Sequence, residues 1–333
     1  MPLDGFHRDI NYLRISLTDH CNLRCLYCMP IRELRFAPVE YLLTAAEIER
    51  VVRTAVRVGF GKFRLTGGEP TLRQDLVEIV ERLAQIDGVD DLSMTTNGIT
   101  LPRLAQPLKR AGLHRVNLHI DTHNLRRLMR FGSIDKIWAG VEAAVDAGFS
   151  PIKINSVVTR DYNDQDVVDL ARLTLDRDWH VRFIELMPLG EGECANVALS
   201  QFVPTSETRQ RIEAALGELT PVASSNPADE SRNHRLPDAR GVVGFISPVS
   251  EPYCGTCNRM RLTSDGKFHL CLLTDDEIDI KSALRNGATD GDLEALLHRA
   301  VRTKPTGHRL DEGISVRGRE MFQICGCSGN FPR

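Results

Sequence analysis

The first two thirds of the chain repeats two hydrophobic patterns in turn. Short segments in which every second residue is apolar predict strands, and longer segments with apolar residues three and four positions apart predict helices. Strands are expected at residues 12–18, 62–66, 91–95, 115–120, 152–158 and 180–187. Helices are expected at residues 44–59, 73–86, 101–111, 134–147, 164–175 and 206–219.

Six successive strand–helix units define the expected fold class. Such alternation implies parallel strands joined by right-handed crossovers. Since eight units close a standard barrel, six predict an α/β fold with a partial, TIM-like (β/α)6 barrel. Local signals agree, because Thr44 and Glu47 have the spacing of a capping box and Gly59 ends that helix. Asn163 is the predicted cap of the helix at 164–175.

The pattern changes after the sixth unit. Residues 220–240 are rich in Ser, Asn, Pro, Asp and Arg and are interpreted as an irregular linker or loop. A strand at 242–246 follows, and then strands at 258–263 and 267–273 flank the hairpin signal Asp265-Gly266. Helices at 280–285 and 293–304 precede an irregular tail. We expect a barrel domain at 1–220 and an α+β domain at 221–333 that covers its open side.

Composition excludes several classes of function. The 333 residues carry a net charge of −3, which gives no reason to expect nucleic acid or a membrane as a partner. No apolar run approaches the roughly 20 residues of a membrane span, and the N-terminus lacks a secretory pattern. A cytoplasmic location is therefore expected, where grouped cysteines indicate metal sites more than disulfides.

The first cysteine group is Cys21, Cys25 and Cys28, at CxxxCxxC spacing after the first strand. Three thiolates can hold three corners of a four-iron cluster and leave the fourth iron open to a small molecule. A structural zinc site needs four ligands. His20 is a candidate fourth ligand, but its position next to Cys21 disfavours that alternative.

The second cysteine group is Cys254, Cys257 and Cys271, which the hairpin can bring together. A zinc knuckle that includes His269 is the main alternative to a second cluster. Against it, His269 and Cys271 lie two residues apart on one strand and would crowd a tetrahedral site. Cys194, Cys325 and Cys327 lie apart, and the sequence assigns them no role.

Polar motifs also follow the predicted strands. The segments Gly67-Gly68-Glu69-Pro70 and Thr96-Asn97-Gly98 come where strands end, and that edge carries the site in parallel α/β folds. Arg14, Arg64 and Lys153 lie within predicted strands. If they point into the barrel, they need a bound anion, because a buried cation is costly without one.

The CxxxCxYC loop, the GGEP motif and the six-unit core resemble the radical S-adenosylmethionine (SAM) superfamily. The second cysteine set with the attached segment Asn258-Arg259-Met260-Arg261 resembles, within it, the GTP 3′,8-cyclase family of molybdenum-cofactor biosynthesis. The resemblance implies conversion of GTP to (8S)-3′,8-cyclo-7,8-dihydroguanosine 5′-triphosphate, a lyase reaction. SAM cleavage then gives a 5′-deoxyadenosyl radical that takes the ribose 3′ hydrogen, and the resulting carbon radical attacks C8 of guanine.

The resemblance also implies cofactors and site residues. Two [4Fe-4S] clusters and SAM are the expected cofactors, and Cys21, Cys25 and Cys28 carry the cluster that cleaves SAM. The second set holds a cluster whose open iron binds the guanine base. Positions that match the SAM site are Tyr27, Gly68, His119 and Met187. Positions that match the GTP site are Arg14, Arg64, Thr95, Lys153, Arg259, Met260 and Arg261, with Arg259 and Arg261 also counted as catalytic.

Two departures from the family pattern keep other hypotheses open. His119 stands where the family usually has a serine, and it is either a SAM contact or a core histidine with a local partner. The family's terminal pair of glycines corresponds here to Cys325-Gly326 with seven residues beyond. The alternatives are a two-cluster paralogue acting on another nucleotide or a peptide, and a non-enzymatic iron–sulfur electron carrier or zinc-stabilised binding module. GTP and an unidentified electron donor are the expected partners, and a homodimer is left open.

Overall fold

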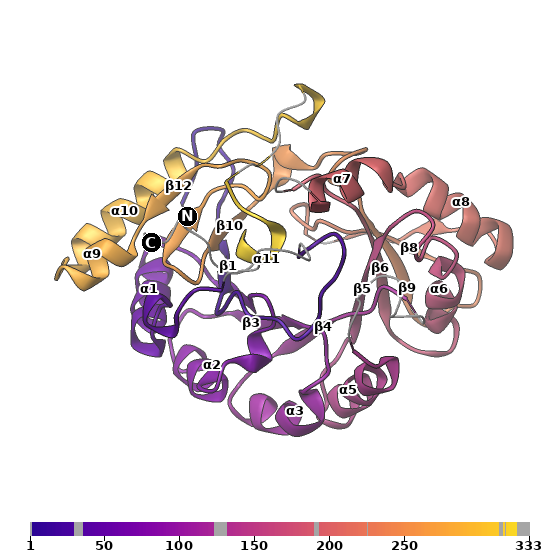
Figure 1. Ribbon diagram of the computed structural model, residues 1–333, viewed down its shortest axis with the longest axis horizontal. Helices are drawn as coiled ribbons and strands as arrows, with labels where there is room; N and C mark the ends of the chain where they lie inside the picture. The colour runs from indigo at the N-terminus through magenta and orange to yellow at the C-terminus, as the bar shows by residue number, and fades with distance from the viewer. Residues whose placement is uncertain are drawn as a thin grey trace.

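One twelve-stranded sheet organises the molecule. The computed structural model describes residues 2–29, 36–122, 132–189, 193–224, 226–312, 316 and 318–324. Within this part, the strands follow the order β12-β11-β10-β1-β2-β3-β4-β5-β6-β9-β8-β7. The sheet curves into an incomplete barrel with helices on its outer side (Figure 1).

The six predicted strand–helix units form the middle of this sheet, and each strand pairs in parallel with the next. The strands are β1 Tyr12–Ser16, β2 Lys62–Thr66, β3 Asp91–Thr96, β4 Arg115–His119, β5 Lys153–Val158 and β6 His180–Glu185. The helices are α1 Ala45–Val58, α2 Leu76–Ala84, α3 Leu101–Arg110, α5 Ile134–Asp146, α6 Val167–Asp176 and α8 Thr205–Leu216. The predicted partial barrel is confirmed.

Alternation along the strands separates the core from the barrel interior. In β2, Phe63 and Leu65 are fully buried in the apolar core, while Arg64 and Thr66 line the interior. The α1 helix covers this core, and it begins with the predicted capping box of Thr44 and Glu47. The same sequence period that buries the apolar side chains therefore turns cationic side chains toward the inside of the barrel.

The C-terminal strands lengthen both edges of the same sheet. At one edge, β9 Val242–Ile246 pairs in parallel with β6, followed by β8 Arg232–Arg235 and β7 Thr220–Pro221. At the other edge, β10 Arg259–Leu262 pairs in parallel with β1, followed by β11 Lys267–His269 and β12 Glu277–Asp279. The predicted hairpin is confirmed. Strands from both sides of the predicted domain boundary at 220/221 belong to one sheet, and the boundary stays a prediction.

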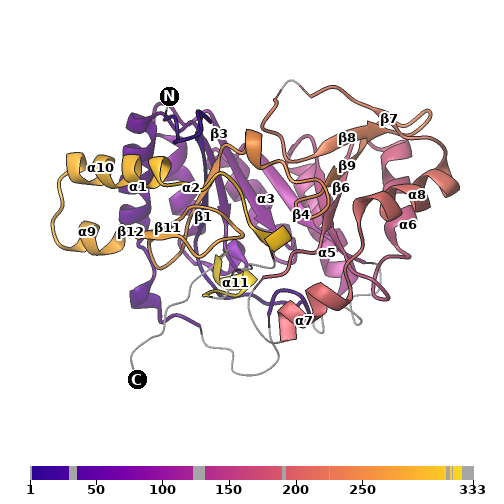
Figure 2. The same cartoon turned by 90° about the horizontal axis from the view of Figure 1, so that it is seen from above.

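Four further α-helices in the described part of the chain lie outside the six central units. They are α7 Glu193–Ser200, α9 Lys281–Arg285, α10 Asp290–Arg302 and α11 Met321–Ile324, and short 3₁₀ helices occur at Val39–Tyr41, Pro70–Leu72, Cys254–Thr256 and Leu310–Glu312. The α9 and α10 helices are on the outer side of the barrel next to α1 (Figure 2). Ion pairs of Arg50 with Asp290 and of Arg57 with Glu294 join α10 to α1. None of the helices in the described segments is long and apolar enough to cross a membrane.

Two local predictions were wrong. The segment 220–240 is not irregular throughout, since it contains β7 and β8. These strands are two and four residues long and partly exposed, so they carry too little hydrophobic periodicity to be recognised. Asn163 does not cap α6, which begins at Val167. The buried Asn163 side chain instead donates hydrogen bonds to the carbonyls of Asp121 and Val157.

Candidate functional site

Both cysteine sets open into one cavity of about 320 Å³ inside the barrel. Its polar lining includes the six grouped cysteines together with Arg14, Tyr27, Arg64, Gly68, Glu69, Thr95, His119, Glu230, Arg259, Arg261, Lys304 and His308. Its apolar lining includes Leu23, Val157, Ile184, Met187, Ile246, Leu272, Leu273 and Met321. Of the predicted site residues, only Lys153 and Met260 are missing from the described lining.

The first cysteine loop is held against the GGEP motif. A turn places the Cys28 amide 3.0 Å from the carbonyl of Cys25. The amides of Gly68 and Glu69 donate hydrogen bonds of 2.7 Å to the carbonyls of Thr18 and His20, next to the loop. The buried Glu69 carboxylate accepts a hydrogen bond of 2.8 Å from the Asn97 amide, which ties the GGEP and TTNG motifs together.

Gly68 is required by a close backbone approach. A Cβ atom there would lie 2.3 Å from the carbonyl oxygen of His20 and 2.5 Å from that of Asp19. Gly68→Ala should lower the free energy of unfolding by about 2–3 kcal/mol, because the backbone must move, and should also lower the iron content. Urea unfolding of the reduced apoprotein and iron analysis measure both effects. In the control Gly291→Ala, the nearest atom to the added Cβ is 3.8 Å away, so both values should stay near wild type. A Gly68→Ala protein with wild-type stability and iron content would show that the approach is not tight.

His119 lines the cavity and also has local partners. Its Nε2 lies 2.6 Å from the Tyr27 hydroxyl and 3.0 Å from Oδ2 of the fully buried Asp121. The Tyr27 hydroxyl donates a hydrogen bond of 2.6 Å to the same carboxylate oxygen. Burial raises the pKa of Tyr27 well above its usual value, and the Asp121 carboxylate raises it further. His119 therefore has local partners, but it lines the cavity and is not a core histidine, and its contact with SAM stays a prediction.

The second cysteine set is fixed by basic residues. Arg8 donates hydrogen bonds of 2.7 Å to the carbonyls of Cys254 and Thr306, which ties the N-terminal segment to this loop. The buried Lys304 donates one of 2.7 Å to the carbonyl of Leu270. Burial acts to raise the pKa of Cys257, but the charges of Lys304, Arg259 and Arg261 outweigh it and lower the pKa to about 7. Cys257 therefore favours the thiolate form that binds metal, whereas burial raises the pKa of Cys254 in the same loop.

The zinc alternatives find no support in the structure. His20 stacks on Phe36 at 4.5 Å, and the buried His269 has its Nδ1 3.3 Å from Glu277, so neither lines the cavity. Two open three-thiol sets around one cavity fit iron–sulfur clusters better, because each leaves one iron without a protein ligand.

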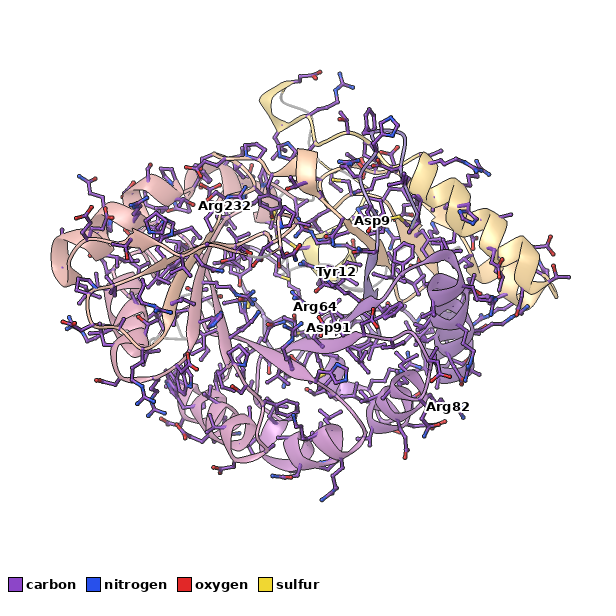
Figure 3. The ribbon with its side chains drawn as sticks, turned by 180° about the vertical axis from the view of Figure 1, so that it is seen from behind. Asp9, Tyr12, Arg64, Arg82, Asp91 and Arg232 are labelled. Carbon is purple, nitrogen blue, oxygen red and sulfur yellow. The ribbon has the colours of Figure 1, made fainter. Side chains whose placement is uncertain are left out.

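Three arginines form a row on neighbouring strands. Arg14 on β1 is in register with Arg64 on β2 and with Arg261 on β10, and all three line the cavity. Directly opposite like charges destabilise a sheet unless an anion lies between them. Tyr12 packs against the Arg14 and Arg64 guanidinium groups, with 5.4 and 5.3 Å to the ring centre. Figure 3 shows Tyr12 and Arg64 inside the ring of strands.

Glu230 lies among these cations and was missed in the sequence. Its Oε1 is 2.8 Å from Nη2 of Arg14 and 3.6 Å from Nη1 of Arg64, and its Oε2 pairs with Arg259. Burial acts to raise the pKa of Glu230, but Arg14, Arg259 and Arg64 outweigh it and hold the pKa well below its usual value. No local pattern marks this residue, because the segment before β8 lacks hydrophobic periodicity.

Lys153 and Met260 differ from the other predicted substrate residues. Burial and, to a smaller extent, the charges of Arg182, Arg115 and Arg64 together lower the pKa of Lys153 to about 8. Lys153 therefore belongs to the same cationic interior although it does not line the cavity. Met260 is fully buried in the core, on the opposite face of β10 from Arg259 and Arg261.

The remaining cysteines and the tail are only partly described. Cys194 is buried in α7. Cys325, Cys327 and the glycine departure at 325–326 lie outside the described residues. The α11 helix ends the described chain, and it places Met321 in the cavity lining and packs Phe322 against Phe36 at 6.2 Å. Figure 1 shows α11 across the centre of the barrel.

Comparisons with known proteins cover nearly the whole chain. Residues 15–174 match the profile of the radical SAM superfamily, and residues 179–310 match that described as Molybdenum Cofactor Synthesis C. The chain is 45% identical to the GTP 3′,8-cyclase of Pelotomaculum thermopropionicum over 97% of its length and 99% of the relative's. It is also 45% identical to that of Moorella thermoacetica, with the same coverage.

A solved structure supports the fold. Streptococcus suis SuiB bound to S-adenosylmethionine superposes with a TM-score of 0.59 at 15% identity, over 79% of this chain and 60% of SuiB. At this low identity the likeness shows the shared fold alone. Together with the match of residues 15–174 to the radical SAM superfamily, the shared fold confirms the radical SAM type of partial barrel.

Proposed function

The chain belongs to the GTP 3′,8-cyclase family of radical SAM enzymes, and we propose that it converts GTP to (8S)-3′,8-cyclo-7,8-dihydroguanosine 5′-triphosphate in the cavity described above. It is an enzyme that uses SAM and iron–sulfur clusters, and this reaction is the first step of molybdenum-cofactor biosynthesis. We place it in the cytoplasm, with GTP as its substrate and a separate electron donor.

One observation carries the proposal: both three-cysteine sets share a cavity with a row of arginines. An electron carrier or a zinc-stabilised binding module has no use for a buried cationic interior. A triphosphate fits such an interior, because it supplies negative charge beyond the single carboxylate that Glu230 offers to Arg14 and Arg64. The two cysteine sets and the arginines together provide for a radical source and a nucleotide in one enclosed space.

Each group of residues has a separate task in this proposal. Cys21, Cys25 and Cys28 hold the first cluster, and Tyr27, Gly68, His119 and Met187 surround SAM beside it. With SAM bound, this cluster supplies the one-electron chemistry that removes a hydrogen atom from the ribose. Cys254, Cys257 and Cys271 hold the second cluster near the guanine base. Arg259 and Arg261, with Arg14 and Arg64, orient the triphosphate through charge-assisted hydrogen bonds.

The apolar part of the lining protects the reaction. Val157, Ile184 and Ile246 come from neighbouring strands, and Met321 of α11 also lines the cavity. Such walls exclude water, which strengthens the electrostatic contacts inside and prevents side reactions of a radical.

Anaerobic reconstitution with iron and sulfide tests the function. With SAM, GTP and dithionite, the loaded protein should take up about eight irons per chain and yield 5′-deoxyadenosine together with the cyclised nucleotide. Formation of 5′-deoxyadenosine that does not respond to GTP would favour a paralogue with another substrate. Stoichiometric zinc without iron would contradict the proposal altogether.

Lys153 should make anion binding depend on pH. In the free protein its pKa is about 8, so it loses its charge as the pH rises through this value. A bound polyphosphate favours the charged form. Affinity for inorganic tripolyphosphate should therefore fall between pH 7.5 and 9.5, by at most about tenfold per pH unit. Calorimetry on wild type and Lys153→Arg, whose guanidinium stays charged, measures this. An equal fall in both proteins would show that another group is responsible.

A further inference from the structure

Glu230 is a carboxylate inside the part of the cavity that we assign to the triphosphate. It lies in the connection between β7 and β8, at one edge of the sheet. Its side chain contacts Arg14 on β1, Arg64 on β2 and Arg259 on β10, at the other side of the barrel opening. The contacts therefore join the β7–β9 side of the incomplete barrel to the side formed by β10, β1 and β2.

The contacts of Glu230 are those that a phosphate would make. Carboxylate and phosphate both present oxygen atoms to guanidinium groups, and both form charge-assisted hydrogen bonds. A polyphosphate that binds Arg14 and Arg259 would have to lie beside the Glu230 carboxylate. In a buried site the two anions repel each other strongly, because the effective dielectric is low. The carboxylate and the polyphosphate therefore exclude each other.

The arginines also retain capacity for a further anion. The Nε atoms of Arg14 and Arg64 are buried and have no hydrogen-bond partner in the described part of the chain. Of the described cavity-lining residues, Glu69 is the other carboxylate, and it is engaged by the Asn97 amide. One carboxylate thus occupies a site whose cations suit a ligand with several negative charges.

The segment that carries Glu230 can leave without breaking the barrel. The strand before it, β7, is two residues long and ends the sheet, and residues 223, 224, 226 and 227 are exposed. Withdrawal of the carboxylate therefore disturbs an edge of the sheet and not the six central strands.

We propose that Glu230 is a specificity-determining residue that competes, within the chain, with the polyphosphate of the substrate for Arg14, Arg64 and Arg259. The inference rests on the proposed function, since it assumes that these arginines bind GTP. It follows that nucleotide binding displaces Glu230, and that the penalty Glu230 imposes grows with the number of phosphates.

Nucleotide binding without turnover tests this competition. Cluster-loaded wild type, Glu230→Gln and the control Glu49→Gln are dialysed anaerobically against labelled GTP, GDP and GMP without reductant. Glu49 pairs with Arg53 and Arg82 on the outer face of α1, away from the cavity. Glu230→Gln should bind GTP at least about tenfold more tightly than wild type, GDP by a smaller factor, and GMP within about threefold. Glu49→Gln should match wild type.

Thermal unfolding gives a second measurement that does not need a nucleotide. Without ligand, Glu230→Gln should unfold at a lower temperature than wild type, because the arginines lose their counter-charge. Inorganic tripolyphosphate should raise the melting temperature of Glu230→Gln by more than that of wild type. Equal shifts in the two proteins would contradict the competition.

The outcomes separate this inference from the proposed function. Unchanged or weaker GTP binding in Glu230→Gln, or an equal gain for all three nucleotides, overturns the role of Glu230 and leaves GTP as the ligand. Absence of guanine-nucleotide binding in both wild type and Glu230→Gln overturns the proposed function and this inference with it.

Discussion

Replacement of Cys25 by alanine should abolish SAM cleavage. Cys25 lies in the turn that joins the first cysteine set, and its backbone carbonyl accepts from the amides of Cys28 and Met29. Removal of its thiol leaves two ligands for a cluster that needs three. Substitution of a residue that only supports a metal ligand typically costs 10- to 100-fold in metal affinity or activity. Because loss of a ligand should cost more, we expect the formation of 5′-deoxyadenosine to fall at least 100-fold. Chromatography of anaerobic reactions with SAM and dithionite measures it.

The matched variant is Cys257→Ala in the second set. It should also lose about half of the iron, but SAM cleavage should persist while the cyclised nucleotide disappears. Such a split would assign different tasks to two chemically identical sets. If Cys257→Ala lost SAM cleavage as completely as Cys25→Ala, the two sets would not be functionally separate.

Replacement of Arg259 by alanine should weaken GTP binding by about 10- to 100-fold. The Arg259 side chain is almost fully buried, pairs with Glu230 and lies 5.0 Å from the ring centre of Tyr253. A hydrogen bond to a charged group contributes about 1.5–3 kcal/mol, which corresponds to this loss of affinity. Uncoupled SAM cleavage should remain largely intact, because Arg259 lies on β10 and not in the SAM-binding loops.

Arg82→Ala is the control for this substitution. Like Arg259, Arg82 forms ion pairs, in its case with Glu49 and Glu78, but it is exposed. Its removal should therefore change neither the affinity for GTP nor the rate of SAM cleavage. Binding of GTP and formation of 5′-deoxyadenosine are measured on the same preparations. Equal losses of both in Arg259→Ala would refute its assigned role in substrate binding.

Hydrophobic periodicity predicted the barrel because its physical cause is local. Phe63 and Leu65 must face the helices, so Arg64 between them must face the interior. The same period separates Met260 from Arg259 and Arg261, and Met260 was nevertheless grouped with them by resemblance. Its place in the core shows that the period of the strand is the better guide to which side chains face the cavity.

Contacts between distant segments could not be predicted. His119 contacts Tyr27, which is 92 residues away in the sequence. Glu230 reaches Arg14 across 216 residues, from a segment whose composition indicates only a loop. The short strands β7 and β8 at the edge of the sheet position the segment that carries Glu230. Such strands depend on pairing with their neighbours more than on their own sequence.

Transfer of hydrogen from the substrate tests the central claim most directly. GTP deuterated at the ribose 3′ position is incubated anaerobically with the reconstituted protein, SAM and dithionite, and the 5′-deoxyadenosine is examined by mass spectrometry. The account predicts that the deuterium is recovered in 5′-deoxyadenosine and that the cyclised nucleotide forms in equal amount. 5′-Deoxyadenosine without deuterium, formed at the same rate with and without GTP, would contradict it.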